Sequence, residues 1–292
     1  MTARIARLSV LLARDAPVGV ILRRGPSKQV LCARWRTDTD AIEEGQWLAG
    51  RIYENRCDLS PTGDKLVYFA AKWKGEHETW TAVSRPPWLT ALIFWPKGDA
   101  WGGGGLFETE KRIALNHPGH QLALAGNTKV PRGVTIVPFG PRPGAGEDGP
   151  IWHARLVRDG WKLTAAGGES EYDGRAHLAW KIDPPTVYAK AAPRDRGVTL
   201  ELRIHGVGEK NGPWYVMEHA LVAGGASASL GKTSFADFDH AGHVVFALGG
   251  KLLRLRRPAA RTLDVAAAEL VADLTDRRFV ARASPVRARQ WR

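Results

Sequence analysis

The sequence predicts an all-β fold, and three observations support this prediction. Short runs rich in Val, Ile, Leu, Phe, Tyr and Trp recur along the chain, and each has the length of a strand. Gly, Pro and Asp residues separate the runs, as hairpin turns require. Helical periodicity is almost absent. We therefore expect successive small antiparallel sheets.

The expected strands occupy nine runs: Gly19–Leu22, Gln29–Trp35, Lys65–Ala70, Trp88–Trp95, Val134–Phe139, Ile151–Val157, Val198–Ile204, Trp214–Met217 and His243–Leu248. A helix is expected over Asp264–Leu274, because Asp264 is a candidate N-cap and Ala and Leu have high helix propensity. Gly140–Pro150 is dense in turn residues and is expected to form an exposed loop.

One segment repeats. Cys57–Ala70 aligns without gaps on Ala236–Gly249, and each copy reads as a strand, a polar turn closed by glycine and a second strand. The matched positions are Asp58 with Asp237, Leu59 with Phe238, Ser60 with Asp239 and Gly63 with Gly242. Weaker copies of the turn carry glycine at Gly25, Gly98, Gly160 and Gly197.

Most intervals between these glycines lie near the roughly 40–45 residues of a four-stranded propeller blade. The spacing predicts an irregular β-propeller of about five to seven blades. Its expected range is residues 1–258, and residues 259–292 are expected to form a short helix and an Arg-rich tail.

The repeat also carries a resemblance. Asp58–Tyr68 resembles the blade turn of TolB-like and WD40-like β-propellers, and Ala236–Phe246 resembles a divergent second copy. The resemblance implies a propeller hairpin and no particular activity. Arg85–Phe107, which contains Trp-Pro-Lys-Gly-Asp-Ala-Trp-Gly-Gly-Gly-Gly, resembles a recurring signature of uncharacterised bacterial proteins.

A propeller predicts roles for particular side chains. Blades are apolar on both faces, so we expect large aromatic residues to fill the space between them. The expected buried residues are Trp35, Trp73, Trp95 and Trp161. Asp58 and Asp237 are expected to cap the turns by accepting hydrogen bonds from nearby backbone N–H groups.

The cysteines and the apolar runs predict a soluble protein in a reducing, cytoplasmic location. Cys32 and Cys57 are too few for a disulfide framework. The apolar run Leu8–Ala13 is shorter than the core of a secretory signal. No run approaches the roughly 20 apolar residues of a membrane span, so no membrane partner is expected.

The positive charge is concentrated at the C-terminal end. The chain has a formal net charge of +12, and residues 251–292 hold 11 Lys or Arg against 4 Asp or Glu. Arginines interleaved with aromatic residues suit phosphate contacts and base stacking. The candidate nucleic-acid-binding residues are Arg277, Arg278, Arg287, Arg289 and Trp291. The alternative is a tail that lies against the propeller, because charge runs usually form solvated surface.

Tryptophans and glycines gather between residues 73 and 107. Exposed tryptophans are common at the centre of protein interfaces. The candidate partner-binding residues are therefore Trp88, Trp101, Gly103 and Gly104. The alternative for the glycine run Gly102–Gly105 is a bulge or a place where another segment packs closely.

Enzyme motifs fail in their context. Ala226–Thr233 nearly matches a phosphate-binding loop, but the following residues read as a strand where a helix is required. The pairs His117/His120 and His240/His243 lack further ligands at suitable spacing, and Glu43–Glu44 reads as solvated surface. The sequence therefore predicts no catalytic residue, cofactor or metal.

These observations predict a non-catalytic scaffold or recognition subunit of a bacterial multiprotein assembly. Two alternatives stay open. One is a nucleic-acid-binding propeller that uses the Arg-rich tail. The other is a hydrolase-like enzyme whose site lies at the propeller channel, where residues from several blades converge without a linear motif.

Overall fold

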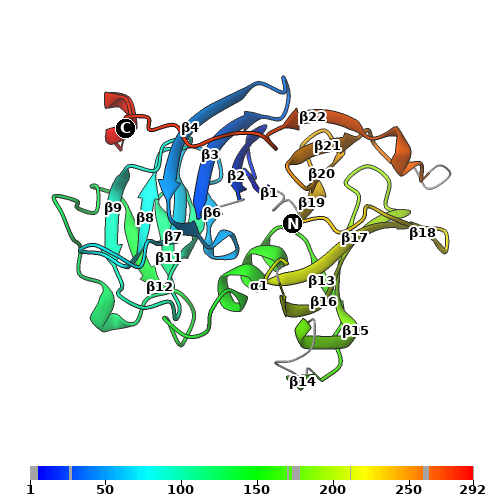
Figure 1. Cartoon of the computed structure of the whole chain (residues 1–292), viewed down its shortest axis with the longest axis horizontal. Helices are drawn as coiled ribbons and strands as arrows, with labels where there is room; N and C mark the ends of the chain where they lie inside the picture. Colours follow the sequence, from blue (N-terminus) through cyan, green and yellow to red (C-terminus); the bar gives the residue numbers. More distant parts are fainter. Residues whose placement is uncertain are drawn as a thin grey trace. The chain divides into compact units, whose positions relative to one another are not determined.

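The computed structural model describes residues 6–25, 28–169, 171–172, 178–210, 212–258 and 263–291. Figure 1 shows that strands dominate the chain, and the described residues form five sheets. The predicted all-β propeller is confirmed, and its blades number five. The chain divides into two compact units, Met1–Arg155 with Asp276–Arg292, and Leu156–Thr275.

The first unit contains three of these sheets. The first is an antiparallel meander of β1 (Arg7–Leu12), β2 (Val18–Arg24), β3 (Gln29–Arg36) and β4 (Ile42–Ala49). The second has β5 (Arg51–Ile52) and β6 (Asp58–Leu59) beside β7 (Leu66–Ala71), followed by β8 (Thr79–Ser84) and β9 (Ala91–Pro96). The third consists of β10 (Gly105–Thr109), β11 (Arg112–Leu115) and β12 (Thr135–Pro138), with β12 parallel to β11. Three 3-10 turns also belong to this unit: η1 (Glu54–Arg56), η2 (Gly119–Gln121) and η4 (Val286–Arg289).

Strand β7 is buried along its whole length and separates two apolar clusters. Its residues Leu66, Tyr68 and Ala70 belong to the cluster shared with the first sheet, and Val67 belongs to the cluster shared with the third. Alternate residues of a strand point to opposite faces, so an all-apolar run covers both sides at once. This two-sided burial is what stacked blades require.

The second unit contains the two remaining sheets. One is built from β13 (Lys162–Ala165), β14 (Glu171–Tyr172), β15 (Leu178–Ala191), β16 (Val198–Glu209), β17 (Tyr215–Ala223) and β18 (Ala226–Ser229). The other is the meander of β19 (Phe235–Phe238), β20 (Val244–Leu248), β21 (Lys251–Leu255) and β22 (Glu269–Asp273). The 3-10 turn η3 (Val265–Ala267) precedes β22.

The helix expected over Asp264–Leu274 is wrong. Asp264 does cap a helical turn, because its side chain accepts a hydrogen bond from the Ala266 N–H, but that turn is the short η3. The residues after it form β22, which pairs with β21 and completes a four-stranded sheet beyond residue 258. Helix propensity is a weak preference, and pairing with an open sheet edge overrides it here.

The strand expected over Ile151–Val157 is also wrong, because these residues lie in helix α1 (Gly149–Arg158). The Trp152 N–H donates to the Asp148 carbonyl, and Pro150 occupies the first turn, where its missing N–H costs nothing. The preceding residues 140–147 are mostly exposed, as expected for the turn-dense loop, while Asp148 is buried.

Three of the four tryptophans predicted to be buried are confirmed. Trp35, Trp95 and Trp161 are at most 3% exposed. The prediction for Trp73 is wrong, because its side chain is 48% exposed. β7 ends at Ala71, so Trp73 lies in the loop beyond the sheet, at a positive φ of 57°.

The repeat predicted from the sequence forms an antiparallel hairpin in both copies. β6 pairs with β7 and β19 pairs with β20, in both cases antiparallel. Gly63 and Gly242 close the two turns at φ +80° and +79°, which is a conformation that favours glycine. The pairing differs by one residue, because Leu59 pairs with Leu66 whereas Phe238 pairs with Val244, so the turn of the second copy is one residue shorter.

The caps of these turns are the second matched pair of polar residues, Ser60 and Asp239. The Ser60 hydroxyl accepts from the Lys65 N–H, and the Asp239 carboxylate accepts from the N–H groups of Ala241 and His243. Both side chains are buried, so these bonds satisfy groups that water does not reach.

The capping role predicted for Asp58 and Asp237 is wrong. Both residues lie in strands, before the turn begins. Asp237 Oδ1 does accept from the neighbouring Phe238 N–H, but both carboxylates also bond to distant elements. Asp58 accepts from the Phe107 N–H of the third sheet, and Asp237 accepts from Lys190 Nζ at 2.5 Å. These two carboxylates link neighbouring parts of their own unit.

Candidate recognition site

Two loops at one end of the second sheet carry exposed tryptophans. Residues 72–78 join β7 to β8 and present Trp73, and residues 97–104 join β9 to β10 and present Trp101, which is 60% exposed. The Lys97 N–H donates to the Thr79 carbonyl, which ties the second loop to the start of β8. The two loops therefore lie at the same edge of one blade.

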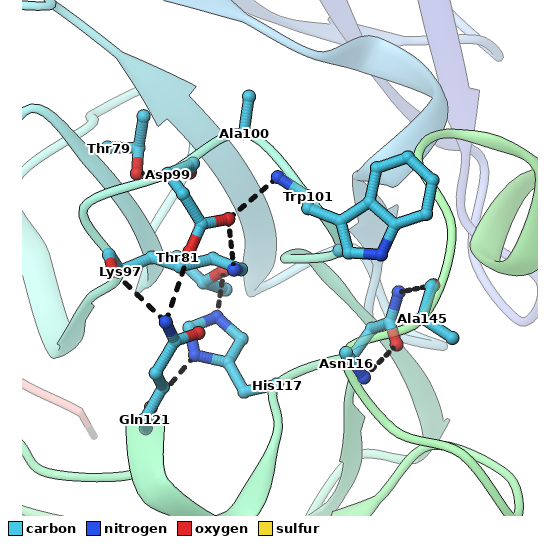
Figure 2. A network of polar contacts seen from close by, with 12 residues as sticks. Thr79, Thr81, Lys97, Asp99, Ala100, Trp101, Asn116, His117, Gln121 and Ala145 are labelled. Atoms are coloured by element: carbon cyan, nitrogen blue, oxygen red, sulfur yellow. Dashed lines mark hydrogen bonds and ion pairs between the residues drawn. The ribbon is translucent and has the colours of Figure 1, made fainter.

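Asp99 fixes the backbone under Trp101. Its Oδ1 accepts from the Trp101 N–H at 2.7 Å and from Lys97 Nζ at 2.6 Å, and its Oδ2 accepts from Gln121 Nε2 at 3.1 Å. Burial opposes ionisation of this carboxylate, but these hydrogen bonds outweigh it and hold the pKa of Asp99 below its ordinary value. Figure 2 shows the indole of Trp101 pointing away from this bonded network.

Asn116 holds the facing loop in the same way. Its Nδ2 donates to the Ala145 carbonyl and its Oδ1 accepts from the Gly144 N–H, as drawn in part in Figure 2. The Gly102 N–H donates to the Gly146 carbonyl at 2.6 Å. Loop 140–148 is thus bonded both to the side chain of Asn116 and to the backbone of the glycine run.

Gly103 and Gly104 are buried, so the prediction that they contact a partner directly is wrong. Both have positive φ, and a Cβ on either would collide with packed atoms. At Gly103 it would lie 2.5 Å from the Phe69 ring, and at Gly104 it would lie 2.1 Å from the Arg56 carbonyl oxygen. The alternative prediction, close packing of another segment, accounts for the glycine run.

Replacing Gly104 with alanine should therefore destabilise the first unit by about 3–5 kcal/mol, which combines left-handed backbone strain with overpacking. Gly98→Ala is the matched control, because Gly98 has φ +88° but open space around its Cβ position. That control should show only the backbone cost, about 1–2 kcal/mol. Urea unfolding of both variants measures the difference, and equal losses would contradict the packing argument.

Arg56 anchors the loop from beneath. Its side chain is 1% exposed, and its Nε donates to Asp148 Oδ1 at 2.5 Å. Its Nη1 donates to the carbonyls of Ala100 and Gly102, both at 2.6 Å. A planar guanidinium with several donors suits this geometry, since it bonds a carboxylate and two carbonyls at once.

His117 and Thr81 form a buried pair whose geometry resembles a nucleophile and its base. His117 Nδ1 lies 2.9 Å from the Gln121 carbonyl, which only accepts, so Nδ1 carries the proton and Nε2 accepts from the Thr81 hydroxyl at 2.7 Å. Burial lowers the pKa of His117 to about 4, which keeps the ring neutral. Thr81 and His117 are both at most 1% exposed, and the Thr81 oxygen already accepts from the Gly104 N–H. The pair lies out of reach of a substrate and supports the loop.

Trp88 does not join this site. It is half-buried in loop 85–90, which connects β8 to β9 at the opposite end of the second sheet. Of the four predicted partner-binding residues, only Trp101 is strongly exposed. Asp99, Asn116 and Arg56 were not predicted. Single Asp, Asn and Arg residues give no sequence signal, because their bonds join segments far apart in the chain.

The arginine-rich tail lies against the first unit, which is the alternative that the sequence left open. Arg277 pairs with Glu44 at 2.5 Å, and Arg287 pairs with Glu43 at 3.6 Å. Arg289 donates to the Ser284 carbonyl, Trp291 is half-buried, and Arg278 is exposed. Glu43 and Glu44, predicted to be plain solvated surface, are thus partners of the tail. Nucleic-acid binding by these residues stays a prediction.

The remaining motifs have structural explanations. Lys232 and Thr233 precede strand β19, and the Thr233 hydroxyl bonds the buried ring of His219, so the P-loop context is missing. Within the part of the chain that the structure describes, no three His, Cys, Asp or Glu side chains gather as a metal site. Burial raises the pKa of both cysteine thiols, Cys57 to about 12, so neither is poised as a nucleophile.

Neither the models of known protein families nor the curated protein sequences give a match to this chain. None of the helices among the described residues has the length and apolar character needed to cross a membrane.

Proposed function

We propose that this chain is a non-catalytic recognition subunit of a multiprotein assembly, and that Trp101 is its central contact. The observation that supports this is that the Trp101 ring is exposed while the backbone around it is held by hydrogen bonds. The side chain is 60% exposed, while the backbone N–H bonds to Asp99 and the neighbouring carbonyls bond to Arg56.

Such a tryptophan binds well for a physical reason. Tryptophan is enriched among residues whose loss costs a complex more than about 2 kcal/mol. A loop already held in one conformation loses little entropy on binding, so more of the contact energy appears as affinity. Trp73, on the other loop at this end of the sheet, offers a second exposed aromatic side chain to a partner protein.

We also propose a propeller type and a cellular setting for this protein. The repeated hairpins support a propeller of the TolB-like or WD40-like type, which presents loops at its ends to partners. The low cysteine content supports a cytoplasmic bacterial setting. The polar pair with the most enzyme-like geometry, Thr81 and His117, is buried, which favours recognition over catalysis.

Changing Trp101 to alanine should reduce the affinity for the native partner by about 30-fold, equivalent to about 2 kcal/mol. The partner is first recovered by affinity purification from the native host, and its affinity for each variant is then measured by calorimetry. Trp214→Ala is the matched control, because Trp214 is also exposed, at 46%, and belongs to the second unit. Unchanged affinity in the Trp101 variant, with the fold intact, would remove the proposed contact.

A further inference from the structure

The C-terminal segment 276–291 occupies a face of the first unit formed by β4 and loop 85–90. We call this the β4 face, defined by Glu43, Glu44, Gln46, Trp47, Arg85 and Thr90. Figure 1 shows the segment passing across β4. The segment follows the second unit in the chain but belongs to the first by its contacts.

Contacts along the segment alternate between charge and aromatic packing. Arg277 pairs with Glu44, and the Arg282 guanidinium donates to the Glu44 carbonyl at 2.5 Å. Between these two arginines, the Phe279 ring packs on Trp47 with centroids 5.9 Å apart. The face therefore recognises two cations with an aromatic side chain between them.

Main-chain contacts fix the rest of the segment. Gln46 Nε2 donates to the Arg282 carbonyl, and the Thr90 hydroxyl donates to Ser284 Oγ at 2.9 Å. At the far end, Arg85 donates to the Trp291 carbonyl at 2.8 Å. The β4 face thus bonds two carbonyls and one hydroxyl of the segment, and the 3-10 turn η4 lies between Ser284 and Trp291.

The face is assembled without the tail. The Gln46 N–H donates to the Pro87 carbonyl, and the Gln46 side-chain oxygen accepts from the Leu89 N–H at 2.7 Å. A Cβ on Gly45 would lie 2.0 Å from the Pro87 oxygen, so glycine permits this close approach. These bonds join β4 to loop 85–90 directly, and none of them involves an atom of the tail.

The tail, by contrast, is held at its surface. Within 276–291, Ser284 and Ala288 are buried, Pro285 and Trp291 are half-buried, and the other residues are exposed. Its ion pairs are partly exposed, with side chains of Arg277 and Arg287 48% and 77% accessible. Exposed pairs contribute about 0–1 kcal/mol each, so the stretch from Arg277 to Arg282 opens at low cost. Trp291 packs against the apolar cluster of the second and third sheets and holds the end of the tail more firmly.

We infer that the β4 face is a binding site for an Arg- and aromatic-containing segment of a partner protein, and that the tail occupies it in cis. The face supplies acidic groups for the arginines and Trp47 for an aromatic side chain. A partner segment would displace the tail. This inference does not depend on Trp101, because the two surfaces share no residue.

The test is fluorescence anisotropy with a labelled peptide of residues 276–291 added to the full-length protein. In the wild type the tail competes at high effective concentration, so peptide binding should be weak. Arg277→Glu with Arg282→Glu repels the tail from Glu44, and the peptide should then bind at least tenfold more tightly. Adding Glu44→Arg to that variant restores pairing in cis and should abolish peptide binding.

Two controls make the result decisive. Adding Glu43→Gln and Glu44→Gln to the opened variant should weaken peptide binding at least tenfold, while Asp38→Asn, another ion-paired carboxylate near β4, should not. A scrambled peptide of the same composition should bind more weakly than the tail peptide. If the opened variant unfolds, Arg277→Gln with Arg282→Gln replaces it.

Several results would overturn the inference. Equal, weak binding to the wild-type and opened proteins means that the tail is only structural. Equal binding of the scrambled peptide means that the face attracts cations without recognising a segment. If the wild-type protein forms dimers at high concentration and the peptide dissociates them, the occupant of the face is a second copy of the chain. None of these results bears on the Trp101 contact, which its own variant tests.

Discussion

Arg56→Ala is expected to lower the free energy of unfolding by about 3–5 kcal/mol, because it removes the buried ion pair between Arg56 and the carboxylate of Asp148. It also removes both donors to the carbonyls of Ala100 and Gly102. The stacking of the guanidinium on the rings of Tyr53 and Phe69, at 4.6 and 5.0 Å, is lost as well. Urea unfolding measures the effect.

Arg51→Ala is the matched control. Arg51 stacks on the same Tyr53 ring at 4.1 Å but is only half-buried, so its loss should cost about 1 kcal/mol or less. Arg56→Ala combined with Asp148→Asn should recover part of the stability, since the uncompensated charge is removed too. A double variant as unstable as the sum of both single variants would contradict the charge argument.

The same substitution connects stability to recognition. Without Arg56, the carbonyls on either side of Trp101 lose their bonds, and the loop loses the fixed geometry that the proposed function requires. Partner affinity should therefore fall for Arg56→Ala even under conditions where the variant remains folded. Trp101→Ala removes the contact itself, so the two variants separate positioning from contact.

Stability is also expected to fall steeply on acidification, because two histidines are buried in neutral form. Burial lowers the pKa of His117 to about 4 and that of His219 to about 3. In the unfolded chain both pKa values are about 6.5, so below that pH the unfolded state binds protons that the folded state does not. Each histidine should therefore remove up to about 1.4 kcal/mol of unfolding free energy per pH unit.

The loss starts near pH 6.5 and continues to about pH 4 for His117 and about pH 3 for His219. Chemical denaturation between pH 6.5 and 5 isolates it, because most carboxylates stay ionised there. His117→Gln should be less stable than the wild type at pH 8 and should show roughly half the pH slope. An unchanged slope in that variant would show that His117 does not carry the effect.

The two hairpins were predictable from the sequence because their features are local. Alternation and turn residues around Gly63 and Gly242 predict two strands and a left-handed glycine, and each of these features is local in the chain. The same logic predicts the burial of Trp35 and Trp95, which lie within apolar strand runs. The pattern fails at Trp73, because the sequence alone does not show that β7 stops two residues earlier.

The two predictions of the wrong secondary-structure type, for residues 264–274 and 151–157, were wrong for a related reason. Residues 264–274 have the composition of a helix, but β21 leaves an unpaired edge that β22 fills. Residues 151–157 have the composition of a strand, but Asp148 and Pro150 start a helix before them. In both segments, residues outside the segment itself decide its secondary structure.

The sequence by itself determined the all-β class and the repeated blade hairpin, because strand period and turn chemistry act over a few residues, and it marked Trp101 only as a candidate contact. Only the tertiary structure decided what those features do. Arg56 and Asp148 are 92 residues apart, and Arg277 and Glu44 are 233 apart, yet each pair bonds. Ion pairs and shared hydrogen bonds depend on distance in space, so the support of the Trp101 loop and the seat of the tail became visible only in the folded chain.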